Sequence, residues 1–290
     1  MEFSILTASP YFLMEIETPL LAMKKIFAFI FALSLIACAT PPKEKFATFP
    51  SGKWIDLSYA YDEHTIFWPT SESFHLDTVF AGMAEGGYYY TAFKFCLAEH
   101  GGTHLDAPIH FSEGKWAADE IPIDRGIGEA VVIDVSEKAL QDSDYLISVA
   151  DVESWEAEHG QIPEDAILLF RTGYGKFWPD RVQYMGTAKL GPEGVAELHF
   201  PGIAPELATW LVENRNIKAA GLDTPSIDYG QSTLFESHRI LYEKNILGLE
   251  NLANLDQLPA KGAWVIALPM KIKGGSGGPL RMAALIPDLP

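Results

Sequence analysis

The stretch His100-Gly101-Gly102-Thr103-His104-Leu105-Asp106-Ala107-Pro108-Ile109-His110 holds three of the eight histidines of this 290-residue chain, together with a carboxylate. His104, Asp106 and His110 are spaced by even numbers of residues, so in an extended segment they leave the same face. Two glycines follow His100 and disfavour a helix, so we expect a loop that folds back and brings His100 beside His104 and Asp106. Imidazole and carboxylate ligands suit Zn, Mn or Fe(II). Packed together without an ion, these groups would bury polar atoms that lack partners, so the stretch predicts a metal site.

The N-terminal part of the chain is predicted to lie outside the folded domain. Residues 1–22 show no targeting pattern and are interpreted as an upstream start that the cell does not use. Residues 23–37 combine a basic start with a short apolar run, which predicts a signal peptide. The run ends in Leu35-Ile36-Ala37-Cys38, which resembles a bacterial lipobox with Cys38 as the lipidated residue. Residues 38–53 then provide lipid attachment and a tether, so we expect an exported lipoprotein on the periplasmic side of a membrane. An ordinary secretory signal is the alternative.

Charge and cysteine content narrow the classes of partner. The net charge of −18 makes nucleic acid and anionic membrane surfaces poor partners, so we expect membrane contact only through the lipid. The chain has two cysteines, Cys38 and Cys96. If Cys38 carries lipid, Cys96 has no partner within the chain, and the domain must be stabilised by its core alone.

Residues 54–290 contain no repeat, low-complexity segment or long linker, so they are predicted to form one domain. Strand-like runs alternate with helical patterns, which predicts an α/β fold, although periodicity does not give the strand order. The last predicted helix begins with a capping-box pattern from Thr233 to Glu236, and Ser232 is the competing cap. Strands are expected at residues 54–57, 88–97, 130–135, 166–171, 217–222 and 263–268, and helices at 149–159, 205–214 and 233–245.

His238 and Glu250 form a second pair of possible ligands. His238 falls on the apolar side of the predicted helix 233–245, where a hydrogen-bonded core histidine is the alternative interpretation. Glu250 interrupts an apolar run, and a buried carboxylate needs a partner or a metal, whereas a surface position would need neither. Spacing alone does not join this pair to the first stretch.

Two further patterns bear on the substrate. Aromatic residues that flank the metal motif in sequence offer flat walls for an aryl substrate, although ordinary core packing would also explain them. Residues 274–278 match the G-x-S-x-G nucleophile elbow, but Pro279 follows where a helix should run, and no histidine lies downstream. A serine hydrolase is therefore rejected in favour of a glycine-rich loop near the substrate. The aromatic candidates for substrate binding are Phe67, Trp68, Tyr88 and Trp116.

The stretch 100–110 resembles the signature of the cyclase family of metal-dependent amide hydrolases, which includes bacterial kynurenine formamidases and isatin hydrolases. The resemblance covers the chain from about Trp54 to Pro287. It implies a single-domain, swivelling β/β/α fold within the α/β class, assembled as a homodimer or homotetramer. The later segments that carry it are 171–173, 221–228, the pair His238 and Glu250, and 267–269 with its glycine-rich sequel.

The resemblance also implies roles for residues at matching positions. His110 would be the acid/base that handles the proton of the attacking water. His238 and Glu250 match the residues that complete a two-zinc site in the formamidases, so one or two ions of Zn or Mn are expected. The metal ligands implied are His100, His104, Asp106, His238 and Glu250.

The expected reaction is hydrolysis of a carbon–nitrogen amide bond in a small aromatic amide, by a metal-bound hydroxide with His110 as general acid/base. The presence of both His238 and Glu250 resembles the formamidases and favours conversion of N-formylkynurenine to kynurenine and formate. The segment Lys273–Arg281 looks more like the isatin hydrolases, so an isatin, cyclic imide or lactone hydrolase is an alternative. A lipid-anchored binding protein without catalysis is the non-enzyme alternative.

Overall fold

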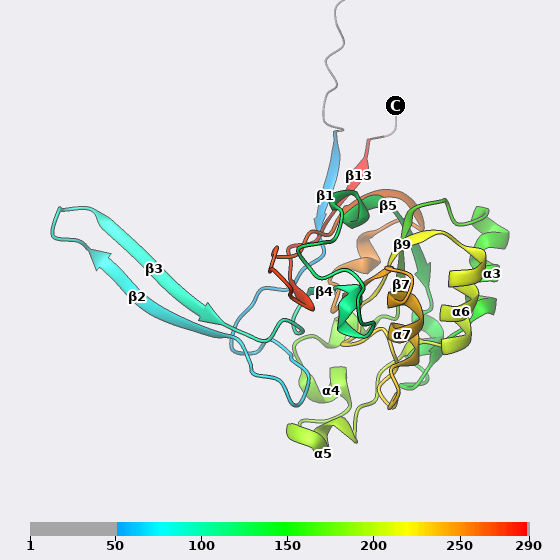
Figure 1. Cartoon of the computed structure of the whole chain (residues 1–290), viewed down its shortest axis with the longest axis horizontal. Coiled ribbons are helices and arrows are strands. Elements are labelled where there is room, and N and C mark those ends of the chain that lie inside the picture. The colour runs from blue at the N-terminus through cyan, green and yellow to red at the C-terminus, as the bar shows by residue number, and fades with distance from the viewer. Residues whose placement is uncertain (1–50, 289–290) are drawn as a thin grey trace, which may run out of the picture. The chain divides into compact units, whose positions relative to one another are not determined.

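The computed structural model describes residues 51–288, and a nine-stranded sheet forms the centre of its fold (Figure 1). The predicted signal peptide and Cys38 lie outside the described residues, so the lipoprotein stays a prediction. From one edge to the other, the strands are β1 (Gly52–Asp56), β13 (Ala283–Pro287), β11 (Lys261–Ile266), β5 (Ile127–Asp134), β7 (Ala166–Arg171), β9 (Ile217–Leu222), β10 (Leu247–Glu250), β4 (His104–Asp106) and β12 (Gly277–Pro279).

The middle of the sheet is parallel, and both margins are antiparallel. β5, β7, β9 and β10 run in one direction, whereas β11 pairs antiparallel with β5 and β4 pairs antiparallel with β10. Parallel strands need crossover connections, which helices provide here. The helices are α2 (Ser136–Ala139), α3 (Val149–His159), α4 (Arg181–Met185), α5 (Gly191–Val195), α6 (Pro205–Asn214) and α7 (Glu236–Tyr242), with 3₁₀ turns η1 (Pro108–His110), η2 (Ile123–Gly126), η3 (Tyr174–Phe177) and η4 (Leu255–Gln257).

The strand β7 is buried on both faces and serves two apolar cores. Leu168 and Phe170 belong to the core that includes Leu207 of α6 and Val152 of α3, two helices that lie on one side of the sheet (Figure 1). Ile167 and its neighbours on the opposite face belong to a second core, made by the curled sheet itself. Burial on both faces explains why the central strands read as continuous apolar runs.

Two short pairs of strands complete the fold. β2 (His75–Met83) and β3 (Tyr89–Cys96) form an antiparallel hairpin that runs away from the large sheet (Figure 1). β6 (Leu146–Ile147) pairs in parallel with β8 (Gly202–Ile203). Among residues 51–288, no helix is long and apolar enough to cross a membrane.

The structure confirms the predicted α/β fold and corrects one helix start. The helices expected at 149–159 and 205–214 have those bounds. The capping box expected from Thr233 was wrong, because Phe235 is left-handed with a φ of 49° and α7 begins only at Glu236. β1 begins at Gly52, two residues before the predicted start of the domain.

Candidate metal centre

Two neighbouring strands and one helix bring four ionisable side chains together. β4 pairs antiparallel with β10, with His104 opposite Glu250. Because side chains alternate along a strand, His104 and Asp106 leave the same face of β4, and Glu250 leaves that face beside His104. His238 reaches the same point from α7, and all four side chains are buried.

His104 presents a nitrogen that lacks a hydrogen-bond partner. Its Nδ1 lies 2.9 Å from the carbonyl oxygen of Gly102, which only accepts, so Nδ1 carries a proton. Its Nε2 lies 3.2 Å from Asp106 Oδ1 and 3.3 Å from Glu250 Oε2, but neither contact has the angles of a hydrogen bond. Burial favours the neutral imidazole, yet the interactions with Asp106 and Glu250 outweigh it and raise the pKa of His104 to about 10. This arrangement requires a positive charge between the nitrogen and the two carboxylates, either a proton or a metal ion.

His238 faces the same two carboxylates from the opposite side. Its Nδ1 donates to Asp228, and its Nε2 lies 3.1 Å from Glu250 Oε1 and 3.4 Å from Asp106 Oδ2. Burial opposes the charged imidazole, but hydrogen bonds to Asp106, Asp228 and Glu250 hold the pKa of His238 well above its usual value. Asp228 thus orients the ring so that Nε2 points to the ligand set, a support common around metal-binding histidines.

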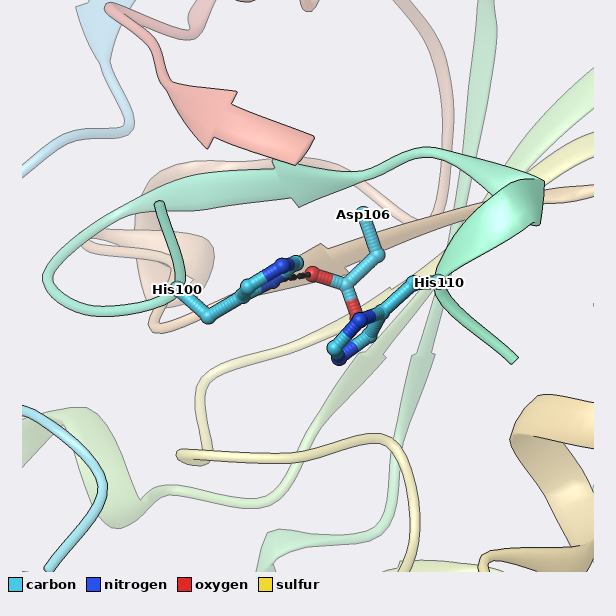
Figure 2. Close-up of side chains that lie close together, drawn as sticks. All are labelled: His100, Asp106 and His110. Atoms are coloured by element: carbon cyan, nitrogen blue, oxygen red, sulfur yellow. Dashed lines mark hydrogen bonds and ion pairs between the residues drawn. The ribbon is translucent and has the colours of Figure 1, made fainter. Parts of the chain in front are cut away.

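Asp106 also belongs to a second group of donors, with His100 and His110 (Figure 2). His100 Nδ1 lies 2.6 Å from Asp106 Oδ1, as the expected loop required. The ring of His110 stacks on that of His100, with centroids 3.8 Å apart and planes 15° apart. Burial alone would raise the pKa of Asp106, but the charge and hydrogen bonds of His100 and its neighbours hold it well below the usual range. Asp106 is therefore an ionised carboxylate that belongs to both donor groups and would serve as a ligand to a bound metal ion.

His110 reaches the site from a turn and not from an extended strand. β4 ends at Asp106, and Pro108 starts the 3₁₀ turn η1, so the shared face that even spacing would give in an extended segment holds for His104 and Asp106 but does not extend to His110. Proline suits the first position of such a turn, because its missing N–H is not needed there. Burial is the main cause that lowers the pKa of His110 to about 4, so the ring is neutral at pH 7 and free to accept a proton.

The glycine-rich loop before β12 supports His100. Ser276 Oγ donates to Glu99 Oε2 at 2.6 Å and lies 2.8 Å from His100 Nε2. Ser276, His100 and Asp106 thus approach the distances of a Ser-His-Asp triad. The serine proton, however, is directed to Glu99, so the serine is not prepared as a nucleophile and the rejection of a serine hydrolase stands. The hydrogen bonds of Ser276 were not predicted, because they join residues 176 or 177 positions apart.

A cavity of about 230 Å³ opens above the two donor groups. Phe67 and Trp68, two of the four predicted substrate-binding residues, line it. Tyr88 and Trp116 do not line it: Tyr88 lies at the end of the hairpin and is 61% exposed, and Trp116 contacts Asn245 through its backbone. The sequence analysis missed two aromatic residues of the wall, Phe111 and Phe235.

The donor set fits a divalent ion. The unpartnered nitrogen of His104 faces two carboxylates, and nitrogen and oxygen donors of this kind bind both Zn and Mn. One ion would be held by His104, Asp106, His238 and Glu250, and His100 adds a further donor beside Asp106, which leaves His110 free for proton transfer. The fold and the site together define an α/β protein with a buried cluster of donors that suits a divalent metal, under an aromatic cavity.

Comparisons with known proteins agree with this class. The Cyclase family model matches residues 55–229. An isatin hydrolase of Roseibium aggregatum is 37% identical over 199 residues, which cover 66% of this chain and 73% of that protein. A kynurenine formamidase of Salinibacter ruber is 30% identical over 240 residues, covering 81% of this chain and 98% of that protein. The solved structure of isatin hydrolase A from Labrenzia aggregata bound to benzyl benzoate has a TM-score of 0.74 and 32% identity, covering 91% of this chain and 100% of that one. The chain belongs to the cyclase family, a family of hydrolases, as its sequence motifs implied.

Proposed function

We propose that the chain hydrolyses the carbon–nitrogen amide bond of a small, uncharged aromatic amide, with a cyclic amide of the isatin class as the first candidate. The observation that carries the proposal is the pair of donor groups sharing Asp106 at the base of an aromatic cavity. The similarity to isatin hydrolases supports it.

The residues of the site have separate roles in hydrolysis. A divalent ion, when bound, lowers the pKa of water and polarises a carbonyl group. His104, Asp106, His238 and Glu250 would hold it. His110 is neutral at pH 7 and borders the cavity, so it takes a proton from the attacking water and returns it to the leaving nitrogen.

The charge of the cavity favours an uncharged substrate. Among the described residues, no lysine or arginine lines it, whereas Phe67, Trp68, Phe111 and Phe235 do. N-formylkynurenine carries an amino-acid carboxylate that would find no lysine or arginine in the lining, and burying an unpaired charge is costly. A neutral bicyclic amide meets flat apolar walls and no such cost.

An aryl formamide is the second candidate, and it is the one that sequence analysis placed first. Its support is that His238 and Glu250 both face the ligand set, as the resemblance to kynurenine formamidases implied. The two candidates share the bond type and differ in ring closure and charge.

A comparison of three substrates distinguishes the effect of the bond type from the effect of the charge of the substrate. The full chain would be purified, stripped of metal and reloaded with Zn or Mn, and hydrolysis of isatin, formanilide and N-formylkynurenine followed by absorbance. We expect kcat/KM to be at least about tenfold higher for isatin than for N-formylkynurenine, because the charged end has no partner. Formanilide, an uncharged formamide, should also exceed N-formylkynurenine.

The controls test the metal and the chemistry separately. His104→Ala, loaded in the same way, should neither retain metal nor turn over any substrate. Preference for N-formylkynurenine would favour the formamidase candidate. Tight binding of isatin by metal-loaded protein without turnover of any of the three would contradict the proposal and favour a binding protein.

A further inference from the structure

Glu99 directly precedes the first donor of the metal motif, and its side chain is half-buried. Among residues 51–288, no lysine or arginine forms an ion pair with it, so its carboxylate depends on hydrogen bonds. Two come from Ser276 to Oε2 of Glu99, one from the backbone N–H at 3.0 Å and one from Oγ at 2.6 Å. A Cβ on residue 275 would lie 2.6 Å from the other oxygen, Oε1, so Gly275 leaves room for the carboxylate.

The two contacts of Ser276 Oγ have a defined direction. A carboxylate oxygen only accepts, and at 2.6 Å from Glu99 the hydroxyl must donate, because two oxygen lone pairs would repel at that distance. A serine hydroxyl has one proton, so toward His100 Nε2, which is 2.8 Å away, Oγ can only accept. His100 therefore carries a proton on Nε2 and donates it to Ser276.

This direction decides which nitrogen of His100 can bind an ion. A neutral imidazole has one N–H, so a proton on Nε2 leaves a lone pair on Nδ1. Nδ1 lies 2.6 Å from Asp106 Oδ1. The lone pair and the carboxylate oxygen are therefore placed to bind the same ion.

Three histidines beside Asp106 each have one nitrogen held by a neighbouring group. In His104 and His238, Nδ1 is held, by the carbonyl oxygen of Gly102 and by Asp228, and Nε2 points to the ligand set. In His100 the two nitrogens are reversed, because Nδ1 contacts Asp106. This reversal requires a hydrogen-bond acceptor at Nε2 of His100, and the hydroxyl described above is that acceptor.

We propose that Glu99 is a positioning residue for metal binding, which acts through the Ser276 hydroxyl to keep Nδ1 of His100 free as a ligand. The inference rests on the metal centre of the proposed function. It gives the G-x-S-x-G pattern of residues 274–278 a role as the relay between the two side chains. Carboxylates commonly fix the tautomer and orientation of a metal-binding histidine through a hydrogen bond. Here a serine stands between the carboxylate and the ring.

The alternative is that this carboxylate only anchors the glycine-rich loop. Other contacts already hold the loop: the Ala107 N–H donates to the carbonyl oxygen of Ser276 at 2.9 Å, and the Gly274 N–H donates to Asp119 Oδ1 at 2.8 Å. Asp119 is also a half-buried carboxylate, and within the described residues it bonds to this loop and not to His100. Asp119 is therefore the matched control for loop anchoring.

The first test measures the zinc affinity of the full chain by competition with a chelator. Glu99→Ala and Ser276→Ala should each weaken zinc binding about 10- to 100-fold, the usual effect of losing such a support. Asp119→Ala should bind zinc as tightly as wild type. Equal losses in Glu99→Ala and Asp119→Ala would overturn the proposal, because loop anchoring would then explain both.

The double variant tests whether the two side chains act as one chain of contacts. If Glu99 acts only through Ser276, the double alanine variant should bind zinc no more than about twofold more weakly than Ser276→Ala alone. Two independent supports would instead multiply their separate losses. A multiplied loss would contradict the relay.

The position of the proton on His100 gives a readout that loop anchoring would not change. Proton–nitrogen correlation spectra of zinc-loaded protein with isotope-labelled histidine distinguish a protonated ring nitrogen from an ion-bound one. The signals of His100 are assigned by their loss in His100→Gln. We expect the proton on Nε2 and the ion on Nδ1, and a proton on Nδ1 would overturn the proposal.

These measurements do not depend on turnover, so the two proposals can fail separately. Zinc binding that depends on Glu99, without hydrolysis of any substrate, would contradict the proposed function and support the positioning role. Hydrolysis with unchanged zinc affinity in Ser276→Ala would do the reverse. A wild-type chain that binds no zinc would overturn both.

Discussion

The Tyr242 hydroxyl donates a hydrogen bond of 2.8 Å to Oδ2 of Asp106, the carboxylate that the two donor groups share. His100 holds the other oxygen at 2.6 Å, so both oxygens of Asp106 are positioned by neighbouring side chains. Tyr242 lies one helical turn after His238 on α7, and one helix thereby supplies both a candidate ligand and the support of another. Burial, with the nearby carboxylates, raises the pKa of Tyr242, so the hydroxyl remains a donor.

Removing this hydroxyl should weaken metal binding. We expect Tyr242→Phe to lower metal affinity about 10- to 100-fold, the usual effect of losing such a support, as measured by competition with a chelator. Tyr184→Phe is the matched control, because Tyr184 is equally buried but bonds to Asp223 and Asn251 and to no ligand. Equal affinities in wild type and Tyr242→Phe would contradict the assigned support.

His110 should matter more for turnover than for metal at the buried group. His110→Ala leaves His104, His238 and Glu250 in place, so at least one ion should remain by elemental analysis. Turnover should fall about 10²- to 10⁴-fold, the typical contribution of a positioned acid/base. Activity within a few-fold of wild type, at equal metal content, would rule out this role.

Metal binding should release protons near neutral pH. Without an ion, the raised pKa values of His104 and His238 keep these rings protonated at pH 7, and an ion must displace the protons. Titration calorimetry in buffers of different ionisation enthalpy would measure the release. It should be smaller in His238→Ala, and binding without any proton release would show that the cluster is not charged as described. Stripping the metal should also lower Tm, because an ion that binds only the folded chain stabilises it.

Two adjacent glycines of β12 should differ in tolerance to a methyl group. A Cβ at Gly277 would lie 2.5 Å from the carbonyl oxygen of Leu105 and 2.7 Å from His100 Cε1, whereas at Gly278 the nearest atoms are 3.6 Å away. Gly277→Ala should displace His100 and reduce kcat/KM by about 100-fold, as a shift of about 1 Å does at a catalytic site. Gly278→Ala should stay within a few-fold of wild type, and equal losses in both would contradict this explanation.

Ionisation of Asp151 should make the free energy of unfolding depend on pH in the acidic range. It completes the capping box of α3 with Ser148 and is 2.5 Å from Lys138 Nζ. Burial raises its pKa, but the hydrogen bonds from Lys138, Ser148 and Tyr145 outweigh burial and lower it. The pKa of Asp151 is lower in the folded chain than in the unfolded chain, where it is about 3.9. Ionised Asp151 therefore stabilises the folded state above that pH, and this contribution is lost as the pH falls through the folded pKa.

The variant Asp151→Asn tests the direction of this pH dependence. We expect a loss of about 1–2 kcal/mol of unfolding free energy at pH 7, typical of a lost cap. Denaturant titrations should show the difference constant between pH 5 and 7 and shrinking below about pH 4. A difference that grows as the pH falls would contradict the assignment.

Much of the fold was predictable, because the signals are local. The helices at 149–159 and 205–214 follow from side-chain periodicity and from Ser148 or Pro205 at their starts. β2 was missed, because Asp77 and Gly82 disfavour a strand and only pairing with β3 stabilises it. The position of Tyr88, far from the cavity, also follows from that pairing.

The sequence by itself indicated a divalent-metal site, because His100, His104, Asp106 and His110 lie within eleven residues and need no distant contact to be recognised. Only the tertiary structure decided how this motif is completed. The register of β4 with β10 sets Glu250 beside His104, and the packing of α7 brings Tyr242 and His238 to Asp106. These contacts join residues more than a hundred positions apart, and strand order and helix packing, which no local pattern encodes, decide which of them form.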